Sequence, residues 1–184
     1  NNDEDGKALR HAIEKYIDNC KIGSDYNSKV KNKQYRIKNL GAQINSHYPD
    51  YAAVSDSNFT YLLYTSRRPE NTGKTRDPYD KKFFEDVWYS EKVKGSFLNA
   101  VNLDGPNQIM DGFTNTADHD AIVSVSTDGK TLFCYKDNGL NMCKWENGIW
   151  GKPVRLPANI NIEGSYEPHA TLSPDGKTLI FSSN

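Results

Sequence analysis

One short motif occurs repeatedly in this chain, and it restricts the fold more than any other feature. Residues 173–181 read SPDGKTLIF, residues 126–135 read STDGKTLFCY, and residues 55–64 read SDSNFTYLLY, a degenerate third copy. Proline sets φ for a type I turn, aspartate tolerates the next position, and glycine adopts the left-handed conformation that closes a bulged hairpin. The apolar residues after the turn alternate as they do in a strand. The chain is therefore predicted to consist of repeated β-hairpins.

A second pattern follows the first two hairpins and extends the repeat. Residues 95–103 and 148–156 share the spacing Gly-x-aromatic-x-x-small-x-x-Leu, and residues 40–45 and 156–161 share Leu-x-x-x-Ile-Asn. One unit is thus predicted to contain four short strands over roughly 50 residues, which is the period of propeller blades. Insertions near residues 67–86 and 104–117 account for the longer first interval.

These patterns predict a mainly β protein, a partial β-propeller of four-stranded antiparallel blades preceded by one α-helix. Residues 35–184 would form two blades and the start of a third. Because a closed propeller needs at least four blades, we expect the remaining blades from the rest of a longer protein or from another chain. Tyr35, Ile37 and Leu40 are predicted to form a strand that completes the last blade of the ring.

Residues 1–34 are predicted to hold a helix and a linker. Apolar residues recur at helical spacing over residues 7–22, with Asp5 as the expected N-cap and Gly23 as the expected stop. A lone helix of this length is marginal in water and needs a partner. Two interpretations are open: the last helix of a preceding helical repeat, or a helix packed on the propeller. The lysine-rich residues 24–34 are interpreted as a solvated linker.

Composition and charge exclude several classes of function. The 184 residues carry 23 Lys and Arg against 24 Asp and Glu, a formal net charge of −1, so no field attracts nucleic acid or an anionic membrane. No apolar run approaches the roughly 20 residues of a membrane-spanning helix. The three cysteines lack a zinc-binding spacing. The chain begins Asn-Asn-Asp without a visible signal peptide, as a mature or trimmed protein would.

The sequence lacks the motifs of several enzyme classes, namely Gly-x-Ser-x-Gly, a phosphate-binding loop, His-Glu-x-x-His and Cys-x-x-Cys. Asp118, His119 and Asp120 could form a metal or acid–base cluster. However, His119 and His169 precede predicted strands at nearly the same register, which favours an architectural role in which the imidazole bonds to neighbouring backbone. We therefore predict no enzyme activity and no cofactor.

The insertion at residues 67–86 is the predicted binding surface, because loops that extend from a regular repeat often carry function. The candidate binding residues are Arg67, Arg68, Asp77, Tyr79, Asp80 and Asp86. Asp77 and Asp80 could also supply oxygen ligands to calcium, although the segment lacks the spacing of a known calcium loop. Whether this loop binds a metal stays open, and no metal site is assigned.

Cys134 and Cys143 are a candidate disulfide. Asn138-Gly139 is the strongest short hairpin signal in the chain, and a two-residue type I′ turn there would place Cys134 opposite Cys143. Non-hydrogen-bonded pairs of this kind bring Cα atoms within ~4.5 Å, at the short end of the disulfide range. The alternative is that the two residues pack between blades as free thiols.

The chain resembles the WD-repeat-like β-propeller repeats of TolB and its relatives, whose characteristic sequence is Ser-Pro-Asp-Gly-Lys-x-Leu-x-Phe. It is more similar still to Bacteroidetes outer-membrane-associated lipoproteins, which join a helical-repeat segment, this propeller and an OmpA-like domain. The similarity covers residues 37–184. It rests on residues 40–46 (LGAQINS), 64–69 (YTSRRP), 77–80 (DPYD) and 85–92 (EDVWYSEK).

The resemblance implies a non-enzymatic scaffold or binding propeller of a cell-envelope protein. Such a protein would be periplasmic, associated with the outer membrane, and would present a surface to protein partners; the family includes type IX secretion and gliding components. No nucleic acid partner and no direct membrane span are expected. The sequence contains no OmpA-like segment, so peptidoglycan binding is not implied. The alternative is a non-catalytic propeller fragment of an enzyme that hydrolyses glycans or peptides.

Overall fold

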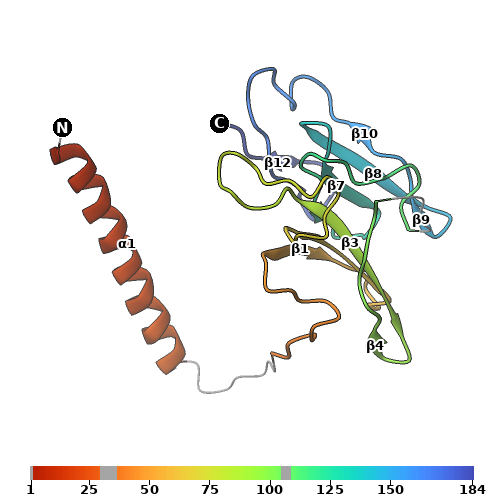
Figure 1. Cartoon of the computed structure of the whole chain (residues 1–184), viewed down its shortest axis with the longest axis horizontal. Coiled ribbons are helices and arrows are strands. Elements are labelled where there is room, and N and C mark those ends of the chain that lie inside the picture. The colour runs from red at the N-terminus through yellow and green to blue at the C-terminus, as the bar shows by residue number, and fades with distance from the viewer. Residues whose placement is uncertain (1, 30–36, 105–108) are drawn as a thin grey trace. The chain divides into compact units, whose positions relative to one another are not determined.

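The computed structural model describes residues 2–29, 37–104 and 109–184 (Figure 1). The chain divides into two compact units, Asn1–Asn39 and Leu40–Asn184. Among the described residues the first unit contains one helix, α1, and the second contains antiparallel strands. The prediction of a mainly β chain with one N-terminal helix is therefore confirmed. The predicted domain boundary between residues 34 and 35 lies outside the described residues.

Helix α1 (Asn2–Lys29) is longer than predicted. Asp5 and Gly23, the expected ends, lie inside it, and residues 24–29 are helical although they were interpreted as linker. The prediction gave Gly23 too much weight, because a glycine in a helix interior costs only about 1 kcal/mol. Within the described part of the chain, no helix is both long and apolar enough to cross a membrane.

The first sheet contains five antiparallel strands. They are β1 (Asp50–Val54), β2 (Tyr61–Ser66), β3 (Asp86–Val93), β4 (Ser96–Phe97) and β5 (Val101–Asn102). Strand β2 pairs with β1 and β3, while β4 and β5 both pair with β3, at different points along its length. The β3–β4 hairpin extends away from the other strands in Figure 1.

The second sheet repeats the topology of the first. It contains β6 (Ala121–Val125), β7 (Thr131–Tyr135), β8 (Leu140–Glu146), β9 (Ile149–Trp150) and β10 (Val154–Arg155), with β9 and β10 both paired to β8. A third hairpin follows, formed by β11 (Ala170–Leu172) and β12 (Leu179–Phe181). The predicted fourth strand is thus divided in two in both sheets. In the second sheet Pro153, which has no N–H to donate, lies in the gap.

The predicted strand around Ile37 and Leu40 is not formed. In the described residues 37–49 the structure has turns and bends but no strand, and Ile37 is 97% exposed. A strand needs a neighbour to receive its ladder hydrogen bonds, and this segment pairs with none of the described strands. Tyr35, the third residue of that prediction, lies outside the described residues.

The predicted hairpin turns are present and nearly identical in the second and third copies. Gly129 donates to the carbonyl of Ser126, and Gly176 to that of Ser173, both at 2.8 Å. The two glycines have φ of 68° and 69°, which is the left-handed conformation expected at this position. In the first copy Phe59 takes this conformation, with φ of 52°.

Two buried asparagines hold the third strand of each sheet in the same way. Asn115 accepts from the N–H of Val87 at 2.9 Å and donates to its carbonyl at 2.8 Å. Asn161 does the same to Leu140, at 2.7 and 2.9 Å. The repeat therefore extends to individual tertiary contacts.

Two aspartates, Asp50 at the start of β1 and Asp120 just before β6, are also bound alike. Asp50 pairs with Arg68 at 2.7 Å, and Asp120 pairs with Lys136 at 2.9 Å. Strand β6 contacts both β1 and β11, so the first strands of successive hairpins are neighbours. Between the first two sheets lies a core whose members include the fully buried Leu63, Leu132 and Trp150.

The β7–β8 hairpin turns one residue earlier than predicted. Lys136 and Gly139 exchange backbone hydrogen bonds of 2.9 and 3.1 Å, so Asp137 and Asn138 are the two turn residues, with φ of 51° and 54°. Positive φ at both positions is the type I′ signature, so the turn type is as expected although its position is not. Arg155 binds the turn in this position, since it donates to the carbonyls of Asp137 and Asn138.

The one-residue difference makes the predicted cysteine pairing wrong. Cys134 lies opposite Asn141, and Cys143 opposite Leu132. The two cysteines therefore share a face as diagonal neighbours, and both are buried free thiols. The hydrogen bond with Cys143 and then burial raise the pKa of the Cys134 thiol.

We expect one thiol to react in the native protein. Cys20 on α1 is exposed, whereas Cys134 and Cys143 are 0% exposed. A titration with a disulfide reagent at neutral pH should modify Cys20 at once and the other two only on unfolding, because the reagent cannot reach a buried thiol. Rapid native modification of all three, or an intact disulfide by mass spectrometry, would contradict this packing.

Candidate functional site

The turns and loops of the β-rich unit lie at two opposite ends of its sheets. Because the strands are antiparallel, the β1–β2 turn (residues 55–60) and the β2–β3 loop (residues 67–85) lie at opposite ends of the first sheet. We call these the turn end and the loop end. The β6–β7 turn lies at the turn end of the second sheet and the β7–β8 turn at its loop end.

At the loop end, Arg67 gathers the acidic residues of the predicted binding loop. Its guanidinium binds both oxygens of Asp80, at 2.5 and 3.0 Å, and its Nε donates to the carbonyl of Phe83. Asp77 and Glu85 lie 3.8 and 3.4 Å from it. Arg67 itself is only 7% exposed. These four ionic residues, together with His119, are called the Arg67 network.

His119 joins the network through side chains and not through backbone, contrary to the prediction. Its Nδ1 is hydrogen-bonded to Glu85, and its Nε2 lies 3.7 Å from Asp77. The bond to Glu85 raises the pKa of His119 although burial opposes this. Burial alone would raise the pKa of Glu85, but hydrogen bonds from His119 and Tyr51 leave it lowered. The contact therefore favours the ionised form of Glu85 and the protonated form of His119.

Asp118, His119 and Asp120, considered as a possible metal or acid–base cluster, do not converge. Asp118 is exposed, while Asp120 is buried and bound to Lys136 and Thr116. Among the described residues no group of three or more His, Cys, Asp and Glu side chains has a metal-binding arrangement.

Arg68 belongs to the interior, which corrects its assignment to the binding surface. It is 8% exposed, donates to Asp50 at 2.7 Å and to the carbonyl of Ile44 at 3.0 Å. Its guanidinium also lies 4.2 Å from the ring centre of Trp88. These contacts join the segment before β1 to the sheet.

Asp86 is likewise interior and cannot contact a partner. It is 0% exposed and accepts from the N–H of Thr72 at 2.6 Å and from Asn102 at 2.5 Å. Burial raises the pKa of Asp86 to about 6. Reversing its charge would place a cation in the interior, so such a variant would test folding and not binding.

Asp86 should make the protein less stable as the pH rises from 4 to 7. Its folded-state pKa of about 6 exceeds the unfolded value, so the folded state holds the extra proton in this range and its advantage is lost as the pH rises through 6. We expect a fall of up to about 2 kcal/mol in unfolding free energy from this group. Urea titrations of the wild type and Asp86→Asn should show a flatter pH profile for the variant. Identical profiles would contradict the raised pKa.

Tyr79 is the predicted binding residue that projects fully into solvent. It is 95% exposed, and its N–H donates to Asp77 at 2.7 Å, which orders the loop tip. The side chains of Asp77 and Asp80 are 16% and 28% exposed because they turn toward Arg67. The structure thus brings Arg67, Asp77 and Asp80 together and leaves Tyr79 at the surface.

Beside the Arg67 network lies a cavity that sequence reasoning missed. It has a volume of about 160 Å³, and we call it the tyrosine cavity. Its polar and aromatic lining consists of Tyr51, Glu85, His119, Tyr135, Tyr166 and His169. The three tyrosines belong to three different hairpin units, so no local pattern connects them.

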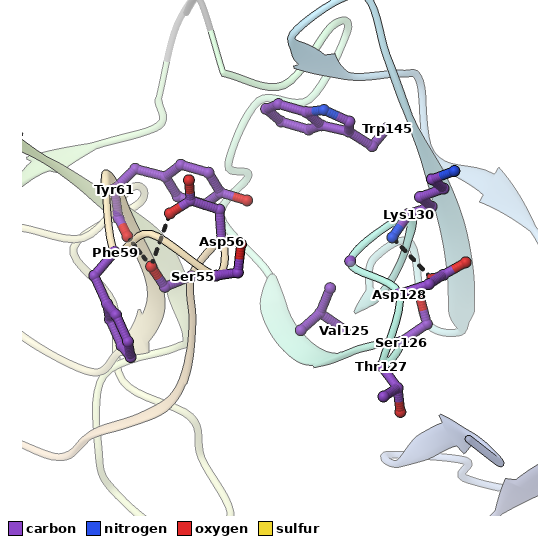
Figure 2. Close-up of a pocket in the computed structure, with 12 residues that line it drawn as sticks. Ser55, Asp56, Phe59, Tyr61, Val125, Ser126, Thr127, Asp128, Lys130 and Trp145 are labelled. Atoms are coloured by element: carbon purple, nitrogen blue, oxygen red, sulfur yellow. Dashed lines mark hydrogen bonds between the residues drawn. The ribbon is translucent and has the colours of Figure 1, made fainter.

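A second space, the turn groove, lies at the turn end between the equivalent turns of the two sheets. In Figure 2 Tyr61 and Asp56 lie on one side, Asp128 and Lys130 on the other, and Trp145 projects over the space between them. Its volume is about 550 Å³. The rings of Tyr61 and Trp145 are nearly parallel, with centroids 6.0 Å apart. Both aspartates are occupied by their own turns, since Asp56 accepts from Thr60 and Asp128 from Lys130.

Comparison with protein families, curated proteins and solved structures found no match to this chain. The internal repeat and the geometry of the two ends therefore carry the functional argument.

Proposed function

We propose that this chain is part of a β-propeller of the WD-repeat-like, TolB-like type and acts as a non-enzymatic scaffold for protein partners in the bacterial cell envelope. The observation that carries the proposal is the residue-level repeat of the two sheets. Asn115 binds β3 in the same way as Asn161 binds β8. The first strands of successive hairpins, β1, β6 and β11, are neighbours. Radial repetition of small antiparallel sheets is the building rule of propellers.

On this proposal further blades, from the same protein or from another chain, pack beyond β11 and β12. The third hairpin has an exposed side chain at Ile180, 60% accessible, and among the described strands β12 pairs with β11 alone. An unpaired strand edge invites another strand. Because the hairpins repeat, we expect the strand that pairs with this edge to belong to the same blade.

The partner would contact the loop end, with Tyr79 at the centre of the contact. Exposed tyrosines are enriched at interfaces because they bury a large ring at a low entropic cost. The Arg67 network supports this role, since it holds the loop in one conformation before binding, which reduces the cost of association. The envelope location rests on the family resemblance of the repeats.

Site-specific photocrosslinking in the native cell tests this function. A photoreactive residue at position 79 should give one discrete protein adduct that fractionates with the envelope. Phe59, at the turn end and 59% exposed, is the matched control position and should give none. Adducts in the cytosolic fraction, adducts from position 59 only, or hydrolysis of glycans or peptides by the purified protein would overturn the proposal.

A further inference from the structure

The tyrosine cavity has the size of a small functional group. Its volume of about 160 Å³ is well below the roughly 300–1,000 Å³ of pockets that hold drug-sized ligands. Tyr51 comes from β1, Tyr135 from the end of β7, and Tyr166 from the segment before β11. A group that enters it would therefore touch three hairpin units at once.

Three tyrosine rings form a large part of the cavity lining. Tyr135 is 8% exposed and packs edge-to-face with Tyr166, at 5.5 Å between centroids and 72° between planes. The Tyr51 hydroxyl donates to Glu85 at 2.8 Å, which fixes the third ring. Aromatic faces carry negative electrostatic potential, and they attract cations that lie within about 6 Å of the ring centre.

The ionic groups around the cavity add to this negative potential. Asp77, Asp80 and Glu85 supply three carboxylates against the guanidinium of Arg67 and the exposed ammonium of Lys82, 3.9 Å from Asp80. The sum is negative when His119 is neutral and zero when it is protonated, so Glu85, which lines the cavity, is the charge nearest a ligand.

The basic side chains of the Arg67 network are already bound to carboxylates. Arg67 gives its two terminal nitrogens to Asp80, and both nitrogens of His119 face carboxylates, Nδ1 toward Glu85 and Nε2 toward Asp77. Glu85 lines the cavity together with the three tyrosines, so its charge lies next to the rings. An anionic ligand would meet unfavourable charge here, whereas a cation would be attracted.

We propose that the tyrosine cavity binds an alkylammonium group, held by the rings of Tyr51, Tyr135 and Tyr166 and attracted by the negative charge of Glu85, whose two oxygens are hydrogen-bonded to Tyr51 and His119. An ammonium head on an alkyl stem matches both parts of the lining, since the charge interacts with the rings and the carboxylate while the stem covers apolar surface. The group could belong to a free amine or to a lysine side chain. This inference is independent of the proposed scaffold function, because it concerns the ligand chemistry of one cavity.

The first test compares choline with 3,3-dimethylbutan-1-ol, in which carbon replaces the charged nitrogen at equal shape. Binding to the full chain is followed by NMR shifts of the tyrosine rings and by calorimetry. Choline should bind at least roughly fivefold more tightly, because only the charged compound gains cation–π energy. Equal affinity for the two compounds would overturn the proposal.

Variants then locate the site. Tyr166 is 51% exposed, so Tyr166→Ala should fold and weaken choline binding roughly two- to fivefold, while Tyr166→Phe should retain it. Tyr79→Ala makes the same chemical change at the loop tip and should leave affinity unchanged. Glu85→Gln should also weaken choline binding. If Glu85→Gln unfolds the chain, the comparison of Tyr166→Ala with Tyr166→Phe still tests the proposal. An unaffected Tyr166→Ala variant would remove the cavity from consideration.

A third comparison separates the two sources of the ammonium group. An acetylated and amidated tripeptide with a central lysine is compared with its norleucine counterpart, alongside choline. Tighter binding of the lysine peptide supports a protein side chain as ligand, and tighter binding of choline supports a free quaternary amine. If neither charged probe binds, the proposal is wrong.

Discussion

Replacing Arg67 with alanine is expected to lower the free energy of unfolding by about 3–5 kcal/mol, because it leaves partly buried carboxylates without their cation. Arg67 is 7% exposed and holds Asp80 through two hydrogen bonds and the carbonyl of Phe83 through a third. Without the guanidinium, Asp77, Asp80 and Glu85 would repel one another. Urea denaturation measures the loss, and limited proteolysis should show new cleavage within residues 67–85.

Two further variants define what the arginine contributes. Arg67→Lys should recover only part of the stability, since a lysine is a point charge and cannot bind both oxygens of Asp80 in a planar fork. Lys82→Ala removes a cation that lies 3.9 Å from Asp80 and is 56% exposed, and it should change stability by less than about 1 kcal/mol. If Arg67→Ala were as mild as Lys82→Ala, the loop would not depend on the network.

Asn161→Ala is expected to cost about 2–4 kcal/mol, because it leaves buried backbone groups unpaired. The side chain accepts from the N–H of Leu140 and donates to the carbonyls of Leu140 and Leu156, all at 2.7–2.9 Å. Leu140 is 0% exposed, so water does not replace these bonds without local opening. Asn115→Ala should have a similar effect in the first sheet, since it binds Val87 in the same way.

The matched control is Asn99→Ala, which truncates an exposed asparagine between β4 and β5 and should be nearly neutral. Asn161→Asp provides a sharper comparison, because a carboxylate can accept from Leu140 but cannot donate to either carbonyl. The midpoints of thermal unfolding of the four variants, compared with the wild type, rank these effects. A neutral Asn161→Ala variant would show that the repeated contact is not a support of the fold.

Local sequence determined the hairpin turns and the repeat. Proline, aspartate and glycine restrict φ within a few residues, so the turns at Ser126 and Ser173 could be predicted without knowledge of their surroundings. The repetition of those signals also predicted sheets of equal topology, which the structure contains. The two halves of each fourth strand were not foreseen, because a break in strand pairing depends on the neighbouring strand.

Element ends and register were decided by tertiary contacts. The turn is centred on Asp137-Asn138 and not on Asn138-Gly139, and Arg155 from β10 binds its two carbonyls. That single shift separated Cys134 from the position opposite Cys143. The Leu-x-x-x-Ile-Asn pattern paired Asn161 with Asn45, whereas Asn115 makes the equivalent contact.

The candidate sites also divide into features that local sequence predicted and features that tertiary contacts decided. Sequence identified the 67–86 loop and its charges, but burial decided that Arg68 and Asp86 serve the interior and that Tyr79 remains exposed. The tyrosine cavity joins residues from three hairpin units, with Tyr51 and Tyr166 more than a hundred positions apart in the chain. Turn preferences act over a few residues and are encoded locally, whereas burial, ion pairing and cavities depend on which distant segments meet, and only the folded structure determines that.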